Sequence, residues 1–232
     1  MQPTQSDRLD PPFWDHQRHV LRQLRLGIEK ALAPLGPGAG RRIIDLGCGD
    51  RPYASLLRKR GFDYVACDIE GDVDVRLVPG ERMALDDASA DVVVSFQVLE
   101  HVWDLDWYLG EARRILRPGG YLLLTTHGSW PYHPHPTDFR RWTRDGLVGE
   151  LESRRFRIEQ VDSVVGLLAL TTQYRLVGIR HALLAIPPLA KVVVPLVASV
   201  MNAQMLLEDA ITPRAIRDAN ACIYVTLSRP IP

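Results

Sequence analysis

A glycine loop followed by an acidic residue is the part of the sequence best suited to hold a nucleoside. Gly47, Cys48 and Gly49 come directly after an apolar run, and glycine lets a backbone approach a ligand closely. Asp45 stands at the end of that run, where its carboxylate can fix the turn through backbone amides or meet an ammonium group through water. Asp68 ends the next apolar run, the position from which an acid accepts both hydroxyls of a ribose. The pattern predicts a site for a nucleoside-containing cofactor.

The same loop disfavours a nicotinamide dinucleotide. The dinucleotide fingerprint asks for a third glycine three residues after the second. This sequence has Pro52 there, beside Arg51. An oxidoreductase is therefore the weaker interpretation of the loop.

Four histidines are candidates for proton transfer, because histidine titrates near neutral pH. His127, His133 and His135 lie in a polar loop after the fifth apolar run, and His101 follows the fourth. Each has a structural interpretation as well. The three loop histidines would then only shape a polar lid, and His101 would cap a helix that begins near Asp104.

Charged residues of the same loop have two interpretations. Asp138, Arg140 and Arg141 are suited to orient a polar or anionic acceptor, or Asp138 and Arg140 pair with each other to fix the loop. The spacing of His133 and His135, with prolines around them, matches no common zinc pattern. We expect no metal site.

Alternating strand and helix patterns must position these residues. Continuous apolar runs predict strands at 42–46, 64–68, 73–78, 91–96, 121–126, 155–165 and 221–228, and helical spacing predicts helices at 13–32, 53–60, 105–116 and 143–153. Strands and helices in alternation are typical of an open, mostly parallel sheet covered on both faces. The predicted class is an α/β fold of Rossmann type. We divide it into an N-terminal helical cap (1–40), a ligand-binding core (41–165) and an apolar extension with the closing strand (166–232).

Composition limits the function classes. A chain of 232 residues with 46% hydrophobic content is enough for one core. Lys+Arg and Asp+Glu are both 28, so nothing resembles the basic surface of a nucleic-acid binder. Three cysteines without paired spacing fit a reducing compartment. The polar Met1 to Pro12 stretch is unlike a signal peptide, and the expected location is cytoplasmic.

The segment from 166 to 210 is unusually apolar. Ala182 to Leu207 contains one charge, Lys191, while three prolines interrupt it. A transmembrane helix needs about 20 uninterrupted apolar residues, and proline breaks the backbone ladder. We expect packed helices rather than a span. Peripheral contact with a membrane, or a homodimer formed through residues 166–210, is compatible with this composition.

Several segments together resemble the class I S-adenosylmethionine-dependent methyltransferases, in the group that includes the ubiquinone and sterol type enzymes. The similarity runs in order and at the expected spacing from about residue 41 to 165. It is carried by Asp45-Leu46-Gly47-Cys48-Gly49, Val65-Ala66-Cys67-Asp68-Ile69, Ser89-Ala90-Asp91-Val92-Val93-Val94-Ser95, Gln97-Val98-Leu99-Glu100-His101-Val102 and Glu111-Ala112-Arg113-Arg114-Ile115-Leu116-Arg117-Pro118-Gly119-Gly120.

The resemblance implies a seven-stranded sheet and S-adenosylmethionine as cofactor. It implies contacts from Asp45, Gly47, Cys48 and Gly49, from Asp68 and Ile69 at the ribose, and from Gln97. The acid that many relatives carry after the third strand is missing, because the sequence there reads Val78-Pro79-Gly80-Glu81-Arg82-Met83-Ala84. Met83 and its backbone are our candidates for the adenine contact.

A narrower resemblance concerns the acceptor of the methyl group. Gly49-Asp50-Arg51-Pro52-Tyr53 and the stretch from His135 to Leu147 are similar to a subgroup associated with bacterial surface polysaccharides. That implies O-methylation of a sugar-containing or other small polar acceptor, such as a glycan or glycolipid. Two alternatives stay open: a lipid or quinone methyltransferase acting at a membrane surface, and a non-catalytic protein that binds the cofactor and a partner.

Overall fold

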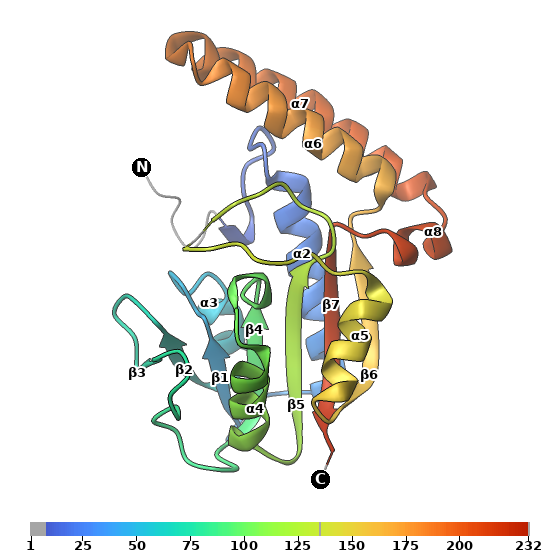
Figure 1. Cartoon of the computed structure of the whole chain (residues 1–232). Coiled ribbons are helices and arrows are strands. Elements are labelled where there is room, and N and C mark those ends of the chain that lie inside the picture. Colours follow the sequence, from blue (N-terminus) through green and yellow to red (C-terminus); the bar gives the residue numbers. More distant parts are fainter. Residues whose placement is uncertain (1–7, 135, 232) are drawn as a thin grey trace.

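The computed structural model describes residues 8–134 and 136–231 and has three layers, a seven-stranded sheet between two layers of helices (Figure 1). The strand order is β3-β2-β1-β4-β5-β7-β6. The strands are β1 (Arg42–Leu46), β2 (Asp63–Asp68), β3 (Val75–Arg76), β4 (Ala90–Phe96), β5 (Leu116–His127), β6 (Phe156–Val164) and β7 (Ile223–Pro230). Only β7 pairs antiparallel with its neighbours. The predicted mostly parallel, seven-stranded α/β sheet is confirmed.

Helices separate most of the strands along the chain, and the last three helices follow one another between β6 and β7. The helices are α2 (Arg18–Leu32), α3 (Ala54–Lys59), α4 (Leu105–Ile115), α5 (Arg144–Ser153), α6 (Leu167–Leu183), α7 (Pro187–Ile211) and α8 (Arg214–Ala219), with short 3-10 turns η1 (Ala33–Leu35) and η2 (Leu99–His101). Because parallel strands need a crossover connection, a helix between strands lies on one face of the sheet.

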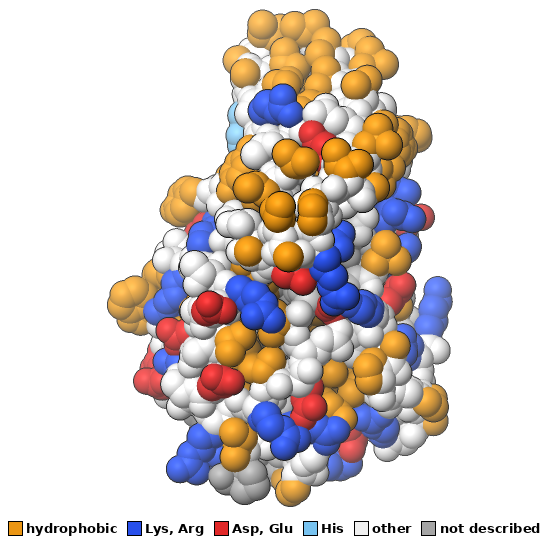
Figure 2. Space-filling view, turned by 90° about the vertical axis from the view of Figure 1, so that its right-hand side faces the viewer, with side chains coloured by type: hydrophobic (Ala, Val, Ile, Leu, Met, Phe, Trp, Pro, Cys, Tyr) orange, Lys and Arg blue, Asp and Glu red, His pale blue; other side chains and the backbone are white. Residues whose placement is uncertain are grey.

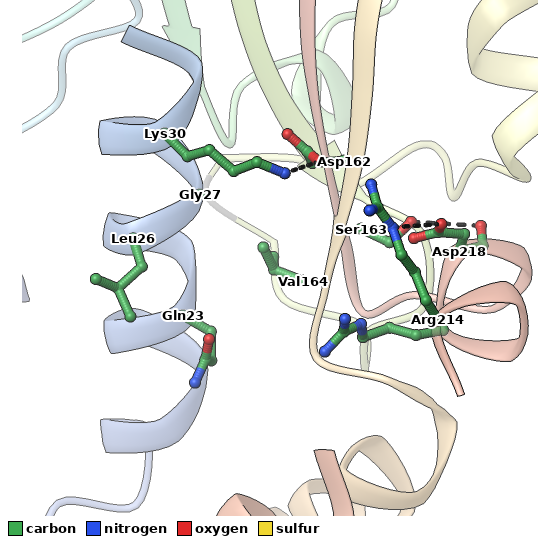
Figure 3. Close-up of a pocket in the computed structure, with 10 residues that line it drawn as sticks. Gln23, Leu26, Gly27, Lys30, Asp162, Ser163, Val164, Arg214 and Asp218 are labelled. Carbon is green, nitrogen blue, oxygen red and sulfur yellow. Dashed lines mark hydrogen bonds and ion pairs between the residues drawn. The ribbon is translucent and has the colours of Figure 1, made fainter. Parts of the chain in front are cut away.

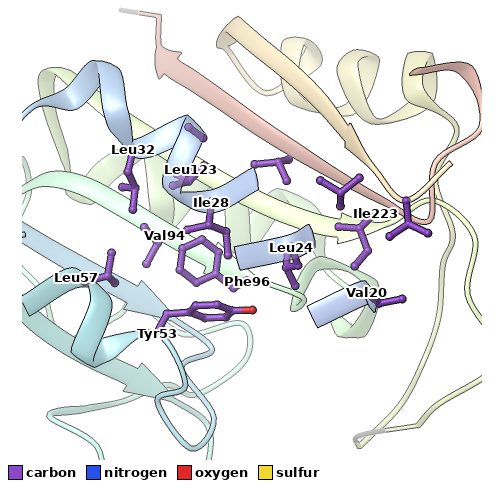
Figure 4. Packing of buried hydrophobic residues seen from close by; sticks show 14 of the residues in the cluster. Val20, Leu24, Ile28, Leu32, Tyr53, Leu57, Val94, Phe96, Leu123 and Ile223 are labelled. Atoms are coloured by element: carbon purple, nitrogen blue, oxygen red, sulfur yellow. The ribbon is translucent and has the colours of Figure 1, made fainter. Parts of the chain in front are cut away.

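Two hydrophobic cores lie on the two faces of the sheet, since successive side chains of a strand point to opposite faces. Val94 and Leu123 belong to the core under α2 and α3, whereas Val93 and Leu124 belong to the core under α4 and α5. Figure 4 shows the first core, where α2 residues pack against strand residues from β4, β5 and β7. The N-terminal helix therefore contributes directly to the main core.

Several element boundaries differ from the prediction. Helix α2 begins at Arg18 rather than residue 13, because the carboxylate of Asp15 accepts the N–H of Gln17 and holds a turn there. The third strand has only two residues, and α8 was not predicted. The division of the chain at residues 40 and 165 stays a prediction.

Helix α7 corrects our expectation that prolines interrupt the apolar extension. Pro187 and Pro188 occupy the first positions of the helix, where a missing N–H costs nothing. Pro195 lies inside the helix, which continues for 25 residues. Of the helices described, α7 is the one long and apolar enough to cross a membrane by length and composition.

Helices α6 and α7 form a hairpin that projects beyond the carboxyl end of the central strands (Figure 1). The side chain of Asn202 on α7 donates to the carbonyls of Phe13 (2.8 Å) and Asp15 (2.9 Å). Gln173 on α6 donates to the carbonyl of His16 (2.9 Å). The base of the hairpin is therefore anchored on the N-terminal segment, on the side of the sheet where open α/β folds bind ligands.

Candidate functional site

The glycine loop after β1 is held against β2 and leaves one surface open. The N–H groups of Gly47 (2.8 Å) and Cys48 (3.1 Å) both donate to the carbonyl of Cys67. A Cβ on Gly47 would lie 2.6 Å from the side chain of Val98, so this position tolerates only glycine. A Cβ on Gly49 would meet nothing within 4 Å. The open space at Gly49 is where a ligand can approach the backbone.

Asp68, at the end of β2, is oriented toward this loop. Its two carboxylate oxygens accept the N–H groups of Gly49 (2.7 Å) and Ile69 (2.6 Å). Each carboxylate oxygen can accept a further hydrogen bond, so the pair can also take the two hydroxyls of a ribose. The predicted placement of Asp68 and Ile69 beside the loop agrees with this geometry.

Asp45 has a different partner from the one expected. It is buried, and the hydroxyl of Tyr64 donates to its carboxyl at 2.7 Å. Burial raises the pKa of Asp45 to about 7, with a smaller increase from the charge of Asp68 and a decrease from the Tyr64 bond. We expected the Asp45 carboxylate to accept backbone N–H groups of the turn, and among the described residues it accepts the Tyr64 hydroxyl instead. An ammonium group placed nearby would stabilise the ionised carboxylate.

This buried carboxyl makes the ligand-free protein pH-sensitive. A folded-state pKa above the unfolded value of 3.8 means that the folded state holds its proton longer, so stability falls as pH rises from about 4 to about 7. Asp45→Asn keeps an acceptor for Tyr64 and removes the titration. Between about pH 5 and about pH 8, the free energy of unfolding of the wild type should fall by on the order of 1–3 kcal/mol more than that of the variant.

Urea unfolding at those two pH values measures the difference. The wild-type chain is the control for the variant, because the two chains share every other titrating group. Identical pH dependence for both chains would show that Asp45 is ionised in the folded protein throughout.

Met83 is not available to the adenine, which corrects our prediction. Its side chain is buried in the core, its N–H donates to Glu111 (2.7 Å) and its carbonyl accepts from Arg114 (3.1 Å). The N–H of Leu77 donates to the carbonyl of Asp68, and the residues that follow each of them, Val78 and Ile69, have exposed apolar side chains. Ile69 and Val78 together offer an apolar surface for a base.

Gln97, just after β4, has an unsatisfied acceptor. Its side-chain amide donates to the hydroxyl of Thr125 at 2.9 Å, and its own backbone is in the left-handed region at φ 57°. The side-chain oxygen is buried and has no hydrogen-bond partner among the described residues. A buried acceptor without a donor costs about 1–3 kcal/mol, so the position fits a ligand that donates, such as the ammonium of a methionine moiety.

A buried carboxyl and imidazole lie together beyond the ends of β4 and β5. Glu100 in η2 is fully buried and accepts a hydrogen bond from the Thr126 hydroxyl at 2.8 Å. The second oxygen of Glu100 is 3.4 Å from Nε2 of His127. The His127 ring stacks on Trp130, with centroids 5.3 Å apart. Glu100 and His127 thus form a carboxyl–imidazole pair.

A second pair of the same kind faces the first. Nδ1 of His133 is 3.5 Å from the carboxylate of Asp138, which Arg141 holds with two hydrogen bonds of 2.5 and 2.6 Å. The rings of His127 and His133 lie edge to face, 5.0 Å between centroids. The side chain of His133 is 28% exposed and that of His127 is 7% exposed. His133 is therefore the imidazole that a ligand can reach.

Electrostatics keep both imidazoles neutral at physiological pH. Burial is the main cause that lowers the pKa of His127 well below its usual range, and neighbouring His133 and Arg141 lower it further. Burial also lowers the pKa of His133, against the opposing charge of Asp138. Burial raises the pKa of Glu100 to about 7. A neutral imidazole can accept a proton, so the cluster is suited to general base chemistry.

The remaining loop predictions have mixed outcomes. Nδ1 of His101 contacts the carbonyl of Thr137, and Asp104 itself caps α4 by accepting the N–H of Trp107, so the capping role given to His101 is wrong. Asp138 pairs with Arg141 and not with Arg140, whose guanidinium donates to backbone carbonyls after η2. His135 lies outside the described residues.

Three ligand atoms of this cluster lie close enough together to hold a metal ion, although the spacing of the histidines in the sequence predicts no metal site. The ligand atoms of Glu100, His127 and His133 all lie within 4.8 Å of one another. The charge of Arg141 already acts on all three groups. A fixed cation in this position disfavours a second one.

Two surface cavities lie outside this cluster. One of about 260 Å³ lies between α2, β6 and α8, where Lys30 pairs with Asp162 and Arg214 with Asp218 (Figure 3). The other, of about 390 Å³, is lined by Trp103 and Arg140 among other residues and lies beside η2. Residues at the start of α4 and the end of α5 also line the second cavity, and neither cavity is lined by a histidine of the cluster.

Comparison with known proteins identifies the family of this chain. The sequence family described as a methyltransferase domain matches residues 14–190. A probable S-adenosylmethionine-dependent methyltransferase of Mycolicibacterium smegmatis is 34% identical over 52% of this chain and 54% of its own length. A ubiquinone biosynthesis O-methyltransferase of Sinorhizobium fredii is 29% identical over 39% of this chain and 42% of its own. The chain spans about half the length of the curated relatives it matches.

Solved structures match the fold at low identity. The crystal structure of the cyclase SpnF covers 90% of this chain and 81% of its own, with a TM-score of 0.58 and 16% identity. Strand order, glycine loop and family match define a class I methyltransferase fold with S-adenosylmethionine as its cofactor. The chain belongs to the methyltransferase-domain family.

Glu100 is the site residue that the sequence analysis did not select. Glu100 lies in one of the segments that resemble the family, and an acid beside a histidine on a short turn is usually solvated. One signal was present in the sequence. Glu100 directly follows the apolar pair Val98-Leu99, just after a strand, which favours burial of the acid at the end of the sheet.

Proposed function

We propose that this protein transfers the methyl group of S-adenosylmethionine to a hydroxyl oxygen of a small polar acceptor. The observation that carries the proposal is the pair of carboxyl–imidazole contacts, Glu100–His127 and Asp138–His133, at the carboxyl edge that also holds the glycine loop. Methyl transfer to a hydroxyl requires alignment and removal of one proton. These contacts supply a base at the place where the acceptor would lie.

The roles of the residues follow from their burial. His133 would accept the hydroxyl proton of the acceptor, because it is the more exposed imidazole of the two. Asp138 orients His133 and stabilises its protonated form. Glu100 and His127 lie behind it and close the site against water. Asp68, Gly49 and Gln97 would hold the ribose and the methionine part of the cofactor, which supplies an activated methyl group when bound.

Aromatic side chains around the loop support a ring-shaped polar acceptor such as a sugar. Trp103 and Tyr132 are 72% and 74% exposed, and Phe139 is 5.2 Å from Trp103 between ring centroids. Aromatic faces with a polar rim suit amphipathic rings. A sugar-containing acceptor therefore remains our proposal for the substrate class.

A second candidate function is methylation of a lipid or quinone, which the apolar α6–α7 hairpin favours. The name of the Sinorhizobium fredii relative, a ubiquinone biosynthesis O-methyltransferase, is in line with it. The cyclase among the structural neighbours illustrates that the fold alone does not determine the reaction. A non-catalytic role would leave the histidines without effect on function.

An assay with methyl-labelled cofactor tests the proposal. We expect label in a panel of sugar-containing acceptors, with a lower or absent signal for quinols and amines. Activity should be unchanged by a metal chelator, because the cluster is assigned to proton transfer. Labelled quinol alone would favour the second candidate, and label in no acceptor despite cofactor binding would favour a non-catalytic role.

A further inference from the structure

The outward face of α7 is an exposed apolar stripe with no partner in the described chain. At 3.6 residues per turn its members fall within a sector of about 100°. They are Leu189, Val192, Leu196, Val200, Leu207 and Ile211, each at least 44% exposed. Figure 2 shows hydrophobic side chains gathered over the projecting end of the molecule. Contiguous exposed apolar surface of this kind marks a protein or membrane contact.

The charged residues of the hairpin between Leu167 and Leu207 are all basic. Between Asp162 and Glu208 the sequence contains no Asp or Glu, whereas Arg175, Arg180 and Lys191 are basic. The whole chain has a formal net charge of zero, so positive charge is concentrated beside the apolar stripe. The outer part of the stripe, from Leu189 to Val200, has only basic charged neighbours in sequence, and such an apolar surface is complementary to an anionic bilayer. Two copies of this chain meeting at the same face would instead bring like charges together.

The length of the projecting part favours insertion into one leaflet. Asn202 hydrogen-bonds the N-terminal segment, and Ala198 and Val197, one turn nearer the tip, still pack in the main core. The part from Pro187 to Leu196 is about 15 Å long at 1.5 Å per residue, which is shorter than the hydrocarbon core of about 30 Å. Phe13 and Trp14 are exposed at the base of the hairpin, and aromatic residues favour the interfacial region.

We infer that the α6–α7 hairpin docks on the surface of an anionic bilayer, with the α7 stripe and the hairpin tip buried among lipid headgroups and upper acyl chains. Burial raises the pKa of Tyr174 on α6, and Arg141, in the loop that carries His133, lowers it, which places this part of α6 near that loop. The docked hairpin therefore sits beside the proposed acceptor site. The inference concerns binding to lipid and is independent of methyl transfer.

Vesicle co-sedimentation of the full chain tests the inference. We expect binding to vesicles of half phosphatidylglycerol and half phosphatidylcholine, and weaker binding to pure phosphatidylcholine or at high salt. Leu196→Glu places a charge in the stripe and should lower the bound fraction by about ten-fold or more. Ile231→Glu, at a side chain with 43% exposure outside the hairpin, is the matched control and should bind as the wild type does.

A second variant reports insertion directly. No tryptophan lies between residues 167 and 211, so Leu196→Trp adds a fluorophore to the stripe. Brominated lipid should quench the added emission. Equal vesicle binding by wild type and Leu196→Glu, or no binding by the wild type, would overturn the inference. A wild-type dimer that Leu196→Glu converts to monomer, without vesicle binding, would overturn it in favour of a second copy.

Discussion

Replacing His133 by alanine is expected to lower the rate of methyl transfer by about 10²- to 10⁴-fold, the usual contribution of a positioned base. Cofactor affinity should be unchanged, because His133 lies in the loop after β5 and the proposed ribose site lies at the end of β2. His133→Gly should regain activity when imidazole is added. Single-turnover kinetics with labelled cofactor, together with calorimetric binding of S-adenosylhomocysteine, measures the two effects separately.

The neighbours of His133 provide the controls. His101→Ala removes a ring 5.0 Å from His133 between centroids but not the base, so we expect a much smaller loss. Glu100→Gln keeps an acceptor for Thr126 and removes a group whose pKa burial raises to about 7. The pH–rate profile of this variant should lose an inflection near neutral pH. Full activity of His133→Ala would assign the base to another residue.

Replacing Asp68 by alanine is expected to weaken binding of S-adenosylhomocysteine by roughly 10²- to 10⁴-fold, since two hydrogen bonds to a charged group contribute about 1.5–3 kcal/mol each. The variant also leaves the N–H groups of Gly49 and Ile69 without their acceptor, which loosens the loop. Asp68→Asn retains one acceptor and should show an intermediate loss. Isothermal titration calorimetry measures all three chains.

Asp63→Asn is the matched control, because Asp63 is an exposed acid at the other end of the same strand. Its affinity should equal that of the wild type. In thermal unfolding, ligand at about 100 times its dissociation constant should add about 2.7 kcal/mol. A stabilisation by NAD alone, or one that Asp68→Ala retains, would contradict the assignment of the ribose site.

The glycine loop and the position of Asp68 beside it could be predicted because they depend on local sequence. Gly47 and Gly49 are needed where the backbone is left-handed, at φ 78° and 53°, and Asp68 ends a continuous apolar strand. Few other residue types fit such positions. Met83 was misplaced because its burial depends on Glu111 and Arg114, which are distant in sequence.

The acceptor half could be predicted only as a set of histidines. The pairing of His127 with Glu100 joins the ends of two strands, and the pairing of Asp138 with Arg141 depends on the path of an irregular loop. No periodicity encodes such contacts. The continuous course of α7 was missed for a related reason, since packing of α6 against α7 overrides the local cost of Pro195.

A crystal structure of the complex with S-adenosylhomocysteine tests the central claim most directly. The account predicts the ribose hydroxyls on Asp68 and the sulfur facing His133 at about 6–8 Å from its nearer ring nitrogen. That distance leaves room for a methyl group, an acceptor oxygen at about 3 Å and one hydrogen bond. A sulfur atom on the far side of the glycine loop, or more than about 12 Å from every imidazole of the cluster, would contradict it.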